Sequence, residues 1–327
     1  MAPEEDLISR RHFLARALKA GLTGTLVAGG GILFYDPDGP IPPIVQAVSL
    51  PEFTISGIKK QLCIVHGPDR KKSLRYAFQA LGGMESFIRP KDRVLIKVNA
   101  AFATPPQLGA TTHPELVSET VRMCIESGAA YVAVTDNPIN DPQSCFELTG
   151  IGPAARQAGA RVILPDPGAF APLTVPNARL IRNWPVMVGP FEGITRVIGM
   201  APVKDHHRSG ASMTLKNWYG LLGGRRNIFH QDIHTIIQEL SIMIRPSLVI
   251  LDGIATMVQN GPTGGSFSDL RRTDTLIVGT DPVAVDAVGA GLLQRSLDRL
   301  PFLEKAEAAG AGTVNYESLK PIRVTAG

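Results

Sequence analysis

Three lysines and two asparagines are the residues of this sequence whose types and positions best suit binding chemistry. Lys97 and Asn99 end an apolar run. Lys204 opens a charged run, and Lys216 is followed directly by Asn217. A lysine at the end of a buried strand can direct its charge at a carboxylate or phosphate, or act as a base whose pKa is lowered by burial. The alternative is a lysine whose stem packs on the sheet while its ammonium reaches solvent. We expect these five residues to bind an anion.

Two further residues are candidates, with Lys97, for acid–base catalysis. His206 lies in the charged run 204–207, and histidine serves as a general acid or base near neutral pH. An exposed loop without a function is the alternative for this run. Asp286 interrupts an otherwise apolar helix face, and a buried carboxylate needs a partner. We expect that partner to be a lysine, Lys97 or Lys216.

Loop and helix-start residues add candidates for substrate binding. Thr112 begins a Thr-x-x-Glu capping box within residues 111–115, and a helix N-terminus attracts anions. Gly261 and Gly264 belong to a glycine-rich loop through which the backbone can approach a ligand closely, although a plain flexible loop has the same composition. The basic turn 223–227 is a further anion-binding candidate.

The metal and cofactor content stays open. Asp252 follows a predicted strand and is the candidate for binding a divalent metal, since such ions prefer oxygen ligands. His230 and His234 have the spacing of zinc ligands on a helix, but the catalytic Glu of a metalloprotease motif is missing, and a solvent-exposed helix face is expected instead. An iron–sulfur cluster normally takes four thiolates and is not expected. The sequence has three cysteines, interpreted as buried apolar residues: Cys63, Cys124 and Cys145.

Strand and helix patterns alternate along most of the chain. The pattern predicts an α/β fold with one mostly parallel, doubly wound sheet. Predicted strands are 61–66, 93–98, 131–135, 161–164, 247–251 and 275–278, and predicted helices are 71–81, 114–127, 152–158, 232–245, 282–294 and 302–309.

A polar rim is expected at the carboxyl ends of the strands, where open α/β sheets bind ligands. The residues predicted to form it are Lys97, Asn99, Asp136, Asn137, Asp166, Asp252, Thr280 and Asp281. Residues of about 172–246 are richer in proline at their start and are interpreted as an irregular insertion, with a hairpin near 195–199.

The N-terminus carries a twin-arginine export signal in residues 9–14, with the pair Arg10 and Arg11. The uncharged run 20–35 is shorter than the roughly 20 residues of a membrane span. Small residues suit cleavage after Ala47, so residues 1–47 are interpreted as signal peptide and linker, and residues 48–327 as the α/β domain. The alternative is an uncleaved leader that tethers the domain to the membrane.

The charge and the missing motifs exclude several classes of protein. A net charge of +4 suits an anionic small molecule better than nucleic acid, for which a strongly basic face is expected. The sequence lacks the phosphate-binding loop Gly-x-x-x-x-Gly-Lys-Ser/Thr and the dinucleotide fingerprint Gly-x-Gly-x-x-Gly. It also lacks the Gly-x-Ser-x-Gly nucleophile elbow.

Six motifs in a fixed order resemble the family catalogued as domain of unknown function 362. The resemblance covers roughly residues 62–325, and its motifs are 94–99, 111–114, 216–220, 251–253, 261–264 and 279–286. It implies an α/β fold with a binding crevice and implies no reaction. Many members of the family are cytoplasmic and some carry a ferredoxin-like module, and this sequence departs from the family on both points.

We therefore expect an exported enzyme that acts on an anionic small molecule, located in the periplasm or on the outer face of the cytoplasmic membrane. A binding protein without catalysis, for an exported anion or cofactor, is the alternative. The expected partners are the twin-arginine export machinery and the small molecule. Nucleic acid is not expected, and the membrane is expected only through an uncleaved leader.

Overall fold

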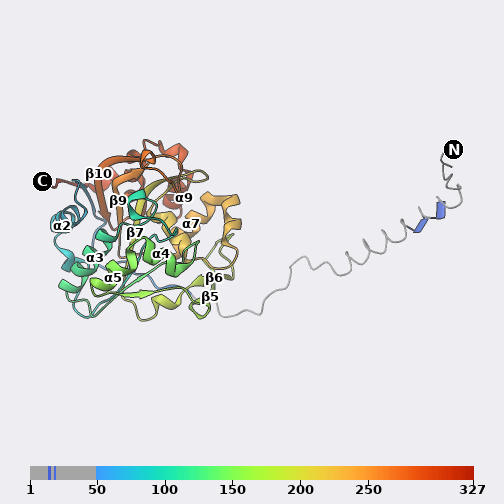
Figure 1. Ribbon diagram of the computed structural model, residues 1–327, viewed down its shortest axis with the longest axis horizontal. Coiled ribbons are helices and arrows are strands. Elements are labelled where there is room, and N and C mark those ends of the chain that lie inside the picture. The colour runs from blue at the N-terminus through green and yellow to red at the C-terminus, as the bar shows by residue number, and fades with distance from the viewer. Residues whose placement is uncertain (1–13, 16–17, 20–48) are drawn as a thin grey trace, which may run out of the picture. The chain divides into compact units, whose positions relative to one another are not determined.

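A mixed, mostly parallel sheet of nine strands lies at the centre of the computed structural model (Figure 1). Its strands are β1 (Leu62–His66), β2 (Arg93–Lys97), β3 (Tyr131–Thr135), β4 (Arg161–Ile163), β7 (Arg196–His206), β8 (Gly210–Ser212), β9 (Leu248–Met257), β10 (Leu270–Gly279) and β11 (Ile322–Thr325). The order is β11-β1-β10-β9-β7-β2-β3-β4, and β8 pairs with β7 beside this path. The predicted α/β fold is confirmed.

The structure describes residues 14–15, 18–19 and 49–327. Residues 14–15 and 18–19 are helical and exposed. The arginine pair Arg10 and Arg11, the run 20–35 and the cleavage position after Ala47 lie outside the described residues. Within the described ranges, no helix combines the length and the apolar character needed to cross a membrane.

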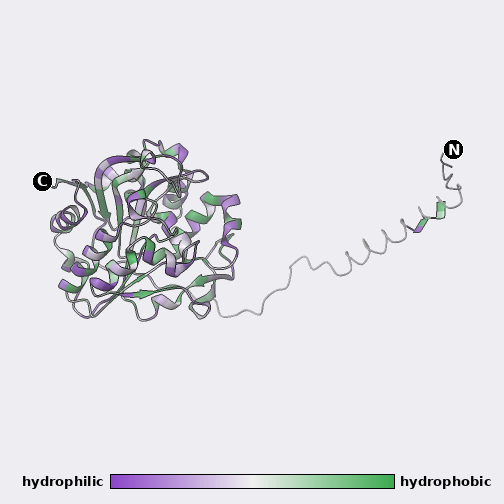
Figure 2. Ribbon diagram, viewed as in Figure 1, coloured by the Kyte–Doolittle hydropathy of each residue, from purple (hydrophilic) through white to green (hydrophobic). Residues whose placement is uncertain are grey.

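Helices cover both faces of the sheet. Helices α2 (Arg70–Ala80), α3 (Pro114–Glu126), α4 (Pro142–Leu148) and α5 (Ile151–Gln157) pack on one face. Helices α6 (Thr214–Asn217), α7 (Ile233–Met243), α8 (Pro282–Leu292) and α9 (Pro301–Ala308) pack on the other. Strand β2 serves both cores, because its side chains alternate: Leu95 enters one core, and Val94 and Ile96 enter the other. Purple and green stretches alternate along the helices of Figure 2, as expected for helices with one buried face.

The expected insertion is wrong for its middle part, because residues 196–206 form β7, a central strand. Strand β7 runs parallel to both β2 and β9. The sequence does not predict this strand, because it contains Gly199 and Pro202, and glycine and proline are both unfavourable inside strands. The structure explains both. A Cβ at Gly199 would lie 2.8 Å from the Trp218 ring, and Pro202 sits at an irregularity in the pairing with β9. The hairpin of this region lies earlier, at β5 (Phe170–Leu173) and β6 (Trp184–Met187).

Two residues of the predicted polar rim, Thr280 and Asp281, do not lie at the carboxyl end of β2. Strand β10 is antiparallel to both β1 and β9, so it ends at the opposite edge of the sheet from Lys97. Thr280 and Asp281 follow β10 and therefore lie at that opposite edge. Asp281 caps helix α8 and forms an ion pair of 2.8 Å with Lys60.

Candidate functional site

A cavity of about 390 Å³ opens at the edge of the sheet where β2, β3 and β7 end. Lys97 is the last residue of β2, and Asp136 directly follows β3. The end of β7, the segment around α6 and the loop 261–263 supply the other walls. The cavity lies where the sequence analysis places a crevice.

The structure brings most of the predicted site residues together. Seven of them line the cavity: Lys97, Asn99, Lys204, His206, Lys216, Asn217 and Gly261. Four others lie outside its lining: Thr112, Asp252, Gly264 and Asp286.

Lys97 forms a buried ion pair with Asp136. The Lys97 Nζ lies 2.6 Å from Asp136 Oδ1, and both side chains are about 98% buried or more. The same ammonium donates to the backbone oxygens of Asn217 (2.6 Å) and Val98 (2.9 Å). Asp136 Oδ2 in turn accepts from the backbone N–H of Ala100 at 2.7 Å. Burial lowers the pKa of Lys97, while Asp136 acts in the opposite direction. The pair is saturated with partners and fixes the strand wall of the cavity.

Gly220 allows the backbone to cover this ion pair. A Cβ at this position would lie 2.3 Å from Asp136 Oδ1 and 2.6 Å from Lys97 Nζ. Both distances are shorter than a Cβ atom tolerates, so glycine is the residue that fits here without displacing the pair.

Asn99 and Asn217 connect the strand ends to α6. Asn217 Nδ2 donates to the backbone oxygens of Met200 (3.0 Å) and Lys97 (3.3 Å), and Asn99 Nδ2 donates to Asn217 Oδ1 at 3.3 Å. Thr112 supports this network from behind. Its hydroxyl accepts from the Asn99 N–H at 2.8 Å and donates to the Met200 oxygen at 3.1 Å.

Thr112 is not the helix cap that the sequence predicted. With Pro114 at the first helical position, His113 becomes the cap of α3, and its Nδ1 accepts from the Glu115 N–H at 3.4 Å. Thr112 thus acts on the cavity through Asn99 and through the Met200 carbonyl oxygen, which Asn217 also contacts.

Lys204 reaches the cavity from β7. Its Nζ donates to the backbone oxygen of Ala110 at 2.5 Å and to Asn99 Oδ1 at 3.4 Å, and it lies 5.2 Å from the centre of the Phe102 ring. Burial, and then the charges of Lys216 and Lys97, lower the pKa of Lys204 to about 7, against a smaller raising effect of Asp136. The neutral amine of Lys204 is therefore much more populated near pH 7 than that of an ordinary lysine.

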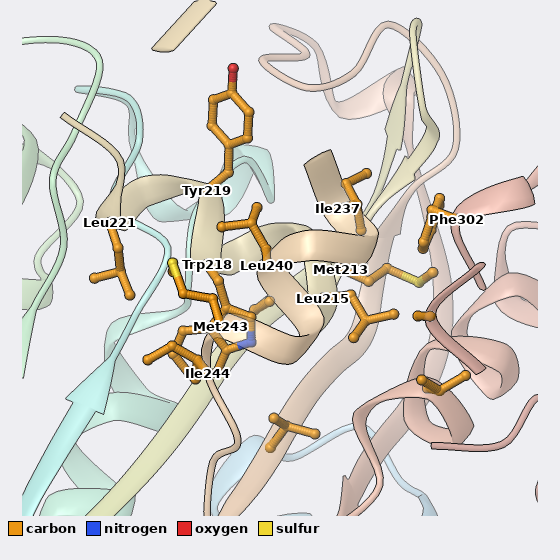
Figure 3. Close-up of a cluster of buried hydrophobic side chains, with 14 of the residues drawn as sticks. Met213, Leu215, Trp218, Tyr219, Leu221, Ile237, Leu240, Met243, Ile244 and Phe302 are labelled. Carbon is orange, nitrogen blue, oxygen red and sulfur yellow. The ribbon is translucent and has the colours of Figure 1, made fainter. Parts of the chain in front are cut away.

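Lys216 extends from α6 beside the Tyr219 ring. Its Nζ lies 5.0 Å from the ring centre. Burial lowers the pKa of Lys216 to about 7, and the charges of Arg226 and Lys97 act in the same direction. In Figure 3, Trp218 points into the apolar cluster, whereas the Tyr219 side chain points away from it.

His206 carries a neutral ring at the cavity wall. Its Nδ1 accepts from the backbone N–H groups of Arg208 (3.3 Å) and Ser209 (3.2 Å), so the proton of the neutral ring is on Nε2. Burial, and then the nearby cations, lower the pKa of His206. The ring stacks on His207 and on His230, with centres 5.1 and 5.8 Å apart.

His230 and Arg226 are site residues that sequence reasoning undervalued. His230, expected on an exposed helix face, is partly buried and lines the cavity, with its Nδ1 3.1 Å from the Tyr219 hydroxyl. Arg226 comes from the basic turn 223–227 and donates to the backbone oxygens of Asn137 (2.9 Å), Pro138 (3.0 Å), Leu222 (3.1 Å) and Gly220 (3.3 Å). The i, i+4 pattern favoured a regular helix, but His230 lies in a 3-10 segment, Arg226–Asp232.

The expected partner of Asp286 is wrong. Asp286 is fully buried and accepts from the Thr214 N–H (2.9 Å), the Thr214 hydroxyl (2.6 Å) and the Leu215 N–H (3.0 Å). It thereby caps α6, because unpaired N–H groups at a helix start attract a carboxylate. Burial raises the pKa of Asp286 to about 7, against these hydrogen bonds. Asp286 positions the segment that carries Lys216 and does not itself reach the cavity lining.

Asp252 and Gly264 also make contacts that hold the fold and lie outside the cavity lining. Strand β9 continues past Asp252 to Met257, and the carboxylate pairs with Arg70 Nε at 2.7 Å. A Cβ at Gly264 would lie 2.7 Å from the Met257 methyl group, and its φ is +58°. The described ranges contain no group of three or more His, Cys, Asp or Glu side chains that could hold a metal ion.

Gly261 holds the loop 261–263 against β7. Its N–H donates to Asp205 Oδ2 at 2.9 Å, and a Cβ would lie 1.9 Å from the Asp205 backbone oxygen. The three cysteines are buried and unpaired, which confirms their interpretation as apolar residues: Cys63, Cys124 and Cys145.

The described cavity lining has an excess of positive charge. It contains four cationic side chains and one carboxylate, which are Lys97, Lys204, Lys216, Arg226 and Asp136. Apolar side chains form part of the same lining, among them Phe102, Ile139 and Pro262. A concave apolar site with a few convergent polar groups is the usual form of a small-molecule site, and this one suits an anion with an apolar part.

A curated protein and a solved structure are each similar to part of this chain. The thylakoid-associated protein sll1697 of Synechocystis sp. is 26% identical over 258 residues, which cover 76% of this chain and 78% of that protein. A Thermotoga maritima protein with a crystal structure is 13% identical in sequence to this chain and superposes on it with a TM-score of 0.38. The match covers 76% of this chain and 60% of that chain. Residues 94–291 match the family described as a domain of unknown function, DUF362, and the chain belongs to that family.

Proposed function

We propose that the protein is an enzyme that binds an anionic small molecule in the cavity at the ends of β2, β3 and β7. The charge of the described lining carries this proposal: four cations face one carboxylate, and that carboxylate is already paired with Lys97. A bound carboxylate or phosphate would offset the repulsion among the remaining cations.

Lys204, Lys216 and His206 supply the acid–base chemistry of this proposal. A lysine with a pKa of about 7 exchanges a proton readily at neutral pH, which an ordinary lysine does not. His206 is neutral and presents an N–H on Nε2. A binding protein would need the lysines but not His206.

Calorimetric titration with phosphate and with small carboxylates tests the proposal. We expect Lys204→Gln and Lys216→Gln each to weaken binding at least about tenfold, the loss that follows from removing one charge-assisted contact. Lys59→Gln is the matched control, because Lys59 is exposed and precedes β1 at the opposite edge of the sheet. Unchanged affinity in both cavity variants would contradict the anion site. His206→Gln should retain binding, and loss of turnover in this variant would favour the enzyme over the binding protein.

We further propose that the protein is exported through the twin-arginine pathway. The support is the motif at residues 9–14, which a receptor reads before export. Arg10→Lys combined with Arg11→Lys should retain the protein in the cytoplasm, whereas Arg16→Lys should not. Fractionation of the host cells measures the outcome, and export of the double variant would contradict the proposal. The N-terminal mass of the exported protein shows whether the leader is cleaved after Ala47.

A further inference from the structure

The three cavity lysines differ in how their ammonium groups are satisfied. Lys97 has Asp136 and backbone oxygens as acceptors, and Lys204 has Ala110 and Asn99. Within the part of the chain that the structure describes, the contact of Lys216 Nζ is with the face of the Tyr219 ring. An ammonium group has three donors, and an aromatic face replaces few of the hydrogen bonds that water would give it. Lys216 is therefore the lysine whose nitrogen is available for chemistry.

The surroundings of Lys216 favour an uncharged amine. The charged and titratable groups around it come from three other segments and are Lys97 of β2, Lys204 and His206 of β7, and Arg226 and His230 of the 3-10 segment Arg226–Asp232. These groups include cations and histidines, whereas the nearest lining carboxylate, Asp136, is bound to Lys97. Neighbouring cations and burial are the combination that activates a nucleophilic lysine. Lys216 also lines the cavity, so a ligand bound there lies beside its side chain.

We infer that Lys216 is a nucleophile that forms an imine with the carbonyl group of an anionic aldehyde or 2-oxo acid. This inference rests on the proposed function, because the cations of the same cavity would hold the carboxylate or phosphate of that compound. The amine lone pair attacks the carbonyl carbon, a C–N bond forms, and the C–O bond breaks. The oxygen leaves as water with the two protons of the amine, and no oxidant or reductant is needed. The partner is thus a small carbonyl compound with a negative charge close to its carbonyl carbon.

Reductive trapping on the full chain tests the inference. The protein is incubated with pyruvate or glyoxylate and cyanoborohydride at pH 7.5, which converts an imine to a stable secondary amine, and the modified lysine is located by peptide mass spectrometry. We expect Lys216 to be modified at least about tenfold faster than the exposed Lys59, since an ordinary lysine is almost fully protonated at this pH. Acetaldehyde, which is an aldehyde like glyoxylate but has no charge, should react more slowly than glyoxylate.

Two variants and one binding measurement separate the outcomes. Lys216→Arg keeps the charge but cannot form an imine, so trapping should be lost while acetate and phosphate still bind. Lys59→Arg is the matched control: it replaces an exposed lysine outside the cavity lining and should keep the modification at Lys216. Binding of acetate or phosphate without modification of Lys216 would overturn the inference and leave the proposed function intact. Absence of both binding and modification would overturn both. Modification mainly at Lys204 would overturn the assignment to Lys216, and equal rates with acetaldehyde would overturn the anionic substrate class.

Discussion

The two walls of the cavity hold lysines in opposite states. On the strand wall, Lys97 is paired with Asp136, and its ammonium donates to backbone oxygens. On the α6 wall, Lys216 faces an aromatic ring and other cations. Both lysines lie within residues 94–291, the part of the chain that matches the family, and both line the same cavity. The difference shows that two lysines of one cavity can have very different contacts, and it supports the reactive role proposed for Lys216.

The number of acceptors around each nitrogen accounts for the two states. A buried charge is tolerated when a counter-charge and hydrogen bonds surround it, and it is costly without them. Lys97 meets that condition and holds β2, β3 and α6 together. Lys216 does not, so its charged form is disfavoured until an anion binds beside it. The comparison therefore assigns a structural role to the first lysine and supports the chemistry proposed for the second.

The largest effect is expected from breaking the strand wall. Lys97→Met leaves the Asp136 carboxylate buried without its counter-charge, which typically costs about 3–5 kcal/mol of unfolding free energy. Urea denaturation measures this loss. The double variant Lys97→Met with Asp136→Leu should recover part of it, because no unpaired charge remains. A change below about 1 kcal/mol in the single variant would show that the pair is not a structural element.

Gly220→Ala tests the same wall from the backbone side. The new methyl group would lie within 2.3 Å of Asp136 Oδ1 and must displace the pair or the segment after α6. Overpacking of this kind costs about 1–3 kcal/mol, measured by the same denaturation. Gly291→Ala is the control, because that position in α8 has open space around it and a helix gains stability from alanine. Equal stability of the two variants would mean that Gly220 is not confined by the ion pair.

Most elements of the sheet could be predicted from the sequence, because their patterns are local. The strand Tyr131–Thr135 and the start of α8 at Pro282 match the prediction, since apolar runs and proline-capped helix starts depend on neighbouring residues. Strand β7 could not be predicted, because Gly199 and Pro202 are explained only by Trp218 and by the pairing with β9. The direction of β10 was also missed: its run 276–278 is continuously apolar, as is typical of parallel strands, yet β10 pairs antiparallel with both neighbours.

The site was predictable in its residue types but not in their pairing. Lys97, Lys204 and Lys216 were found from strand ends and charge, and all three line one cavity. The partner of Asp286 was wrong, because the sequence does not show that α6 begins beside α8 and offers its N–H groups there. Asp136 was placed in the rim, but its choice of Lys97 depends on the close backbone approach that Gly220 allows. Pairing at such a site is decided by tertiary contacts.

A smaller effect is expected from removing the charge on the α6 wall. Lys216→Met should raise the unfolding free energy by about 1 kcal/mol at pH 6, because a poorly paired buried charge is removed. The native pKa of Lys216 is about 7 and lies below the unfolded value. Between these two values the unfolded state therefore binds more protons than the native state. The wild type therefore gains stability from pH 7 to about pH 10 relative to the variant. Denaturation at pH 6 and pH 9 measures this, and a difference that stays constant with pH would contradict the lowered pKa.

The smallest effect is proton uptake when an anion binds. At pH 8 a lysine with a pKa of about 7 is mostly neutral, and a bound anion favours its protonated form. Binding of phosphate or acetate should then take up a fraction of a proton from the buffer at pH 8 and almost none at pH 6, where both lysines are already charged. Titration calorimetry in two buffers with different ionisation heats measures the uptake. The double variant Lys204→Arg with Lys216→Arg stays charged throughout this range, so its binding heat should not depend on the buffer. Equal uptake by this variant and the wild type would assign the proton to another group, and the contrast between the two walls would then rest on hydrogen bonding alone.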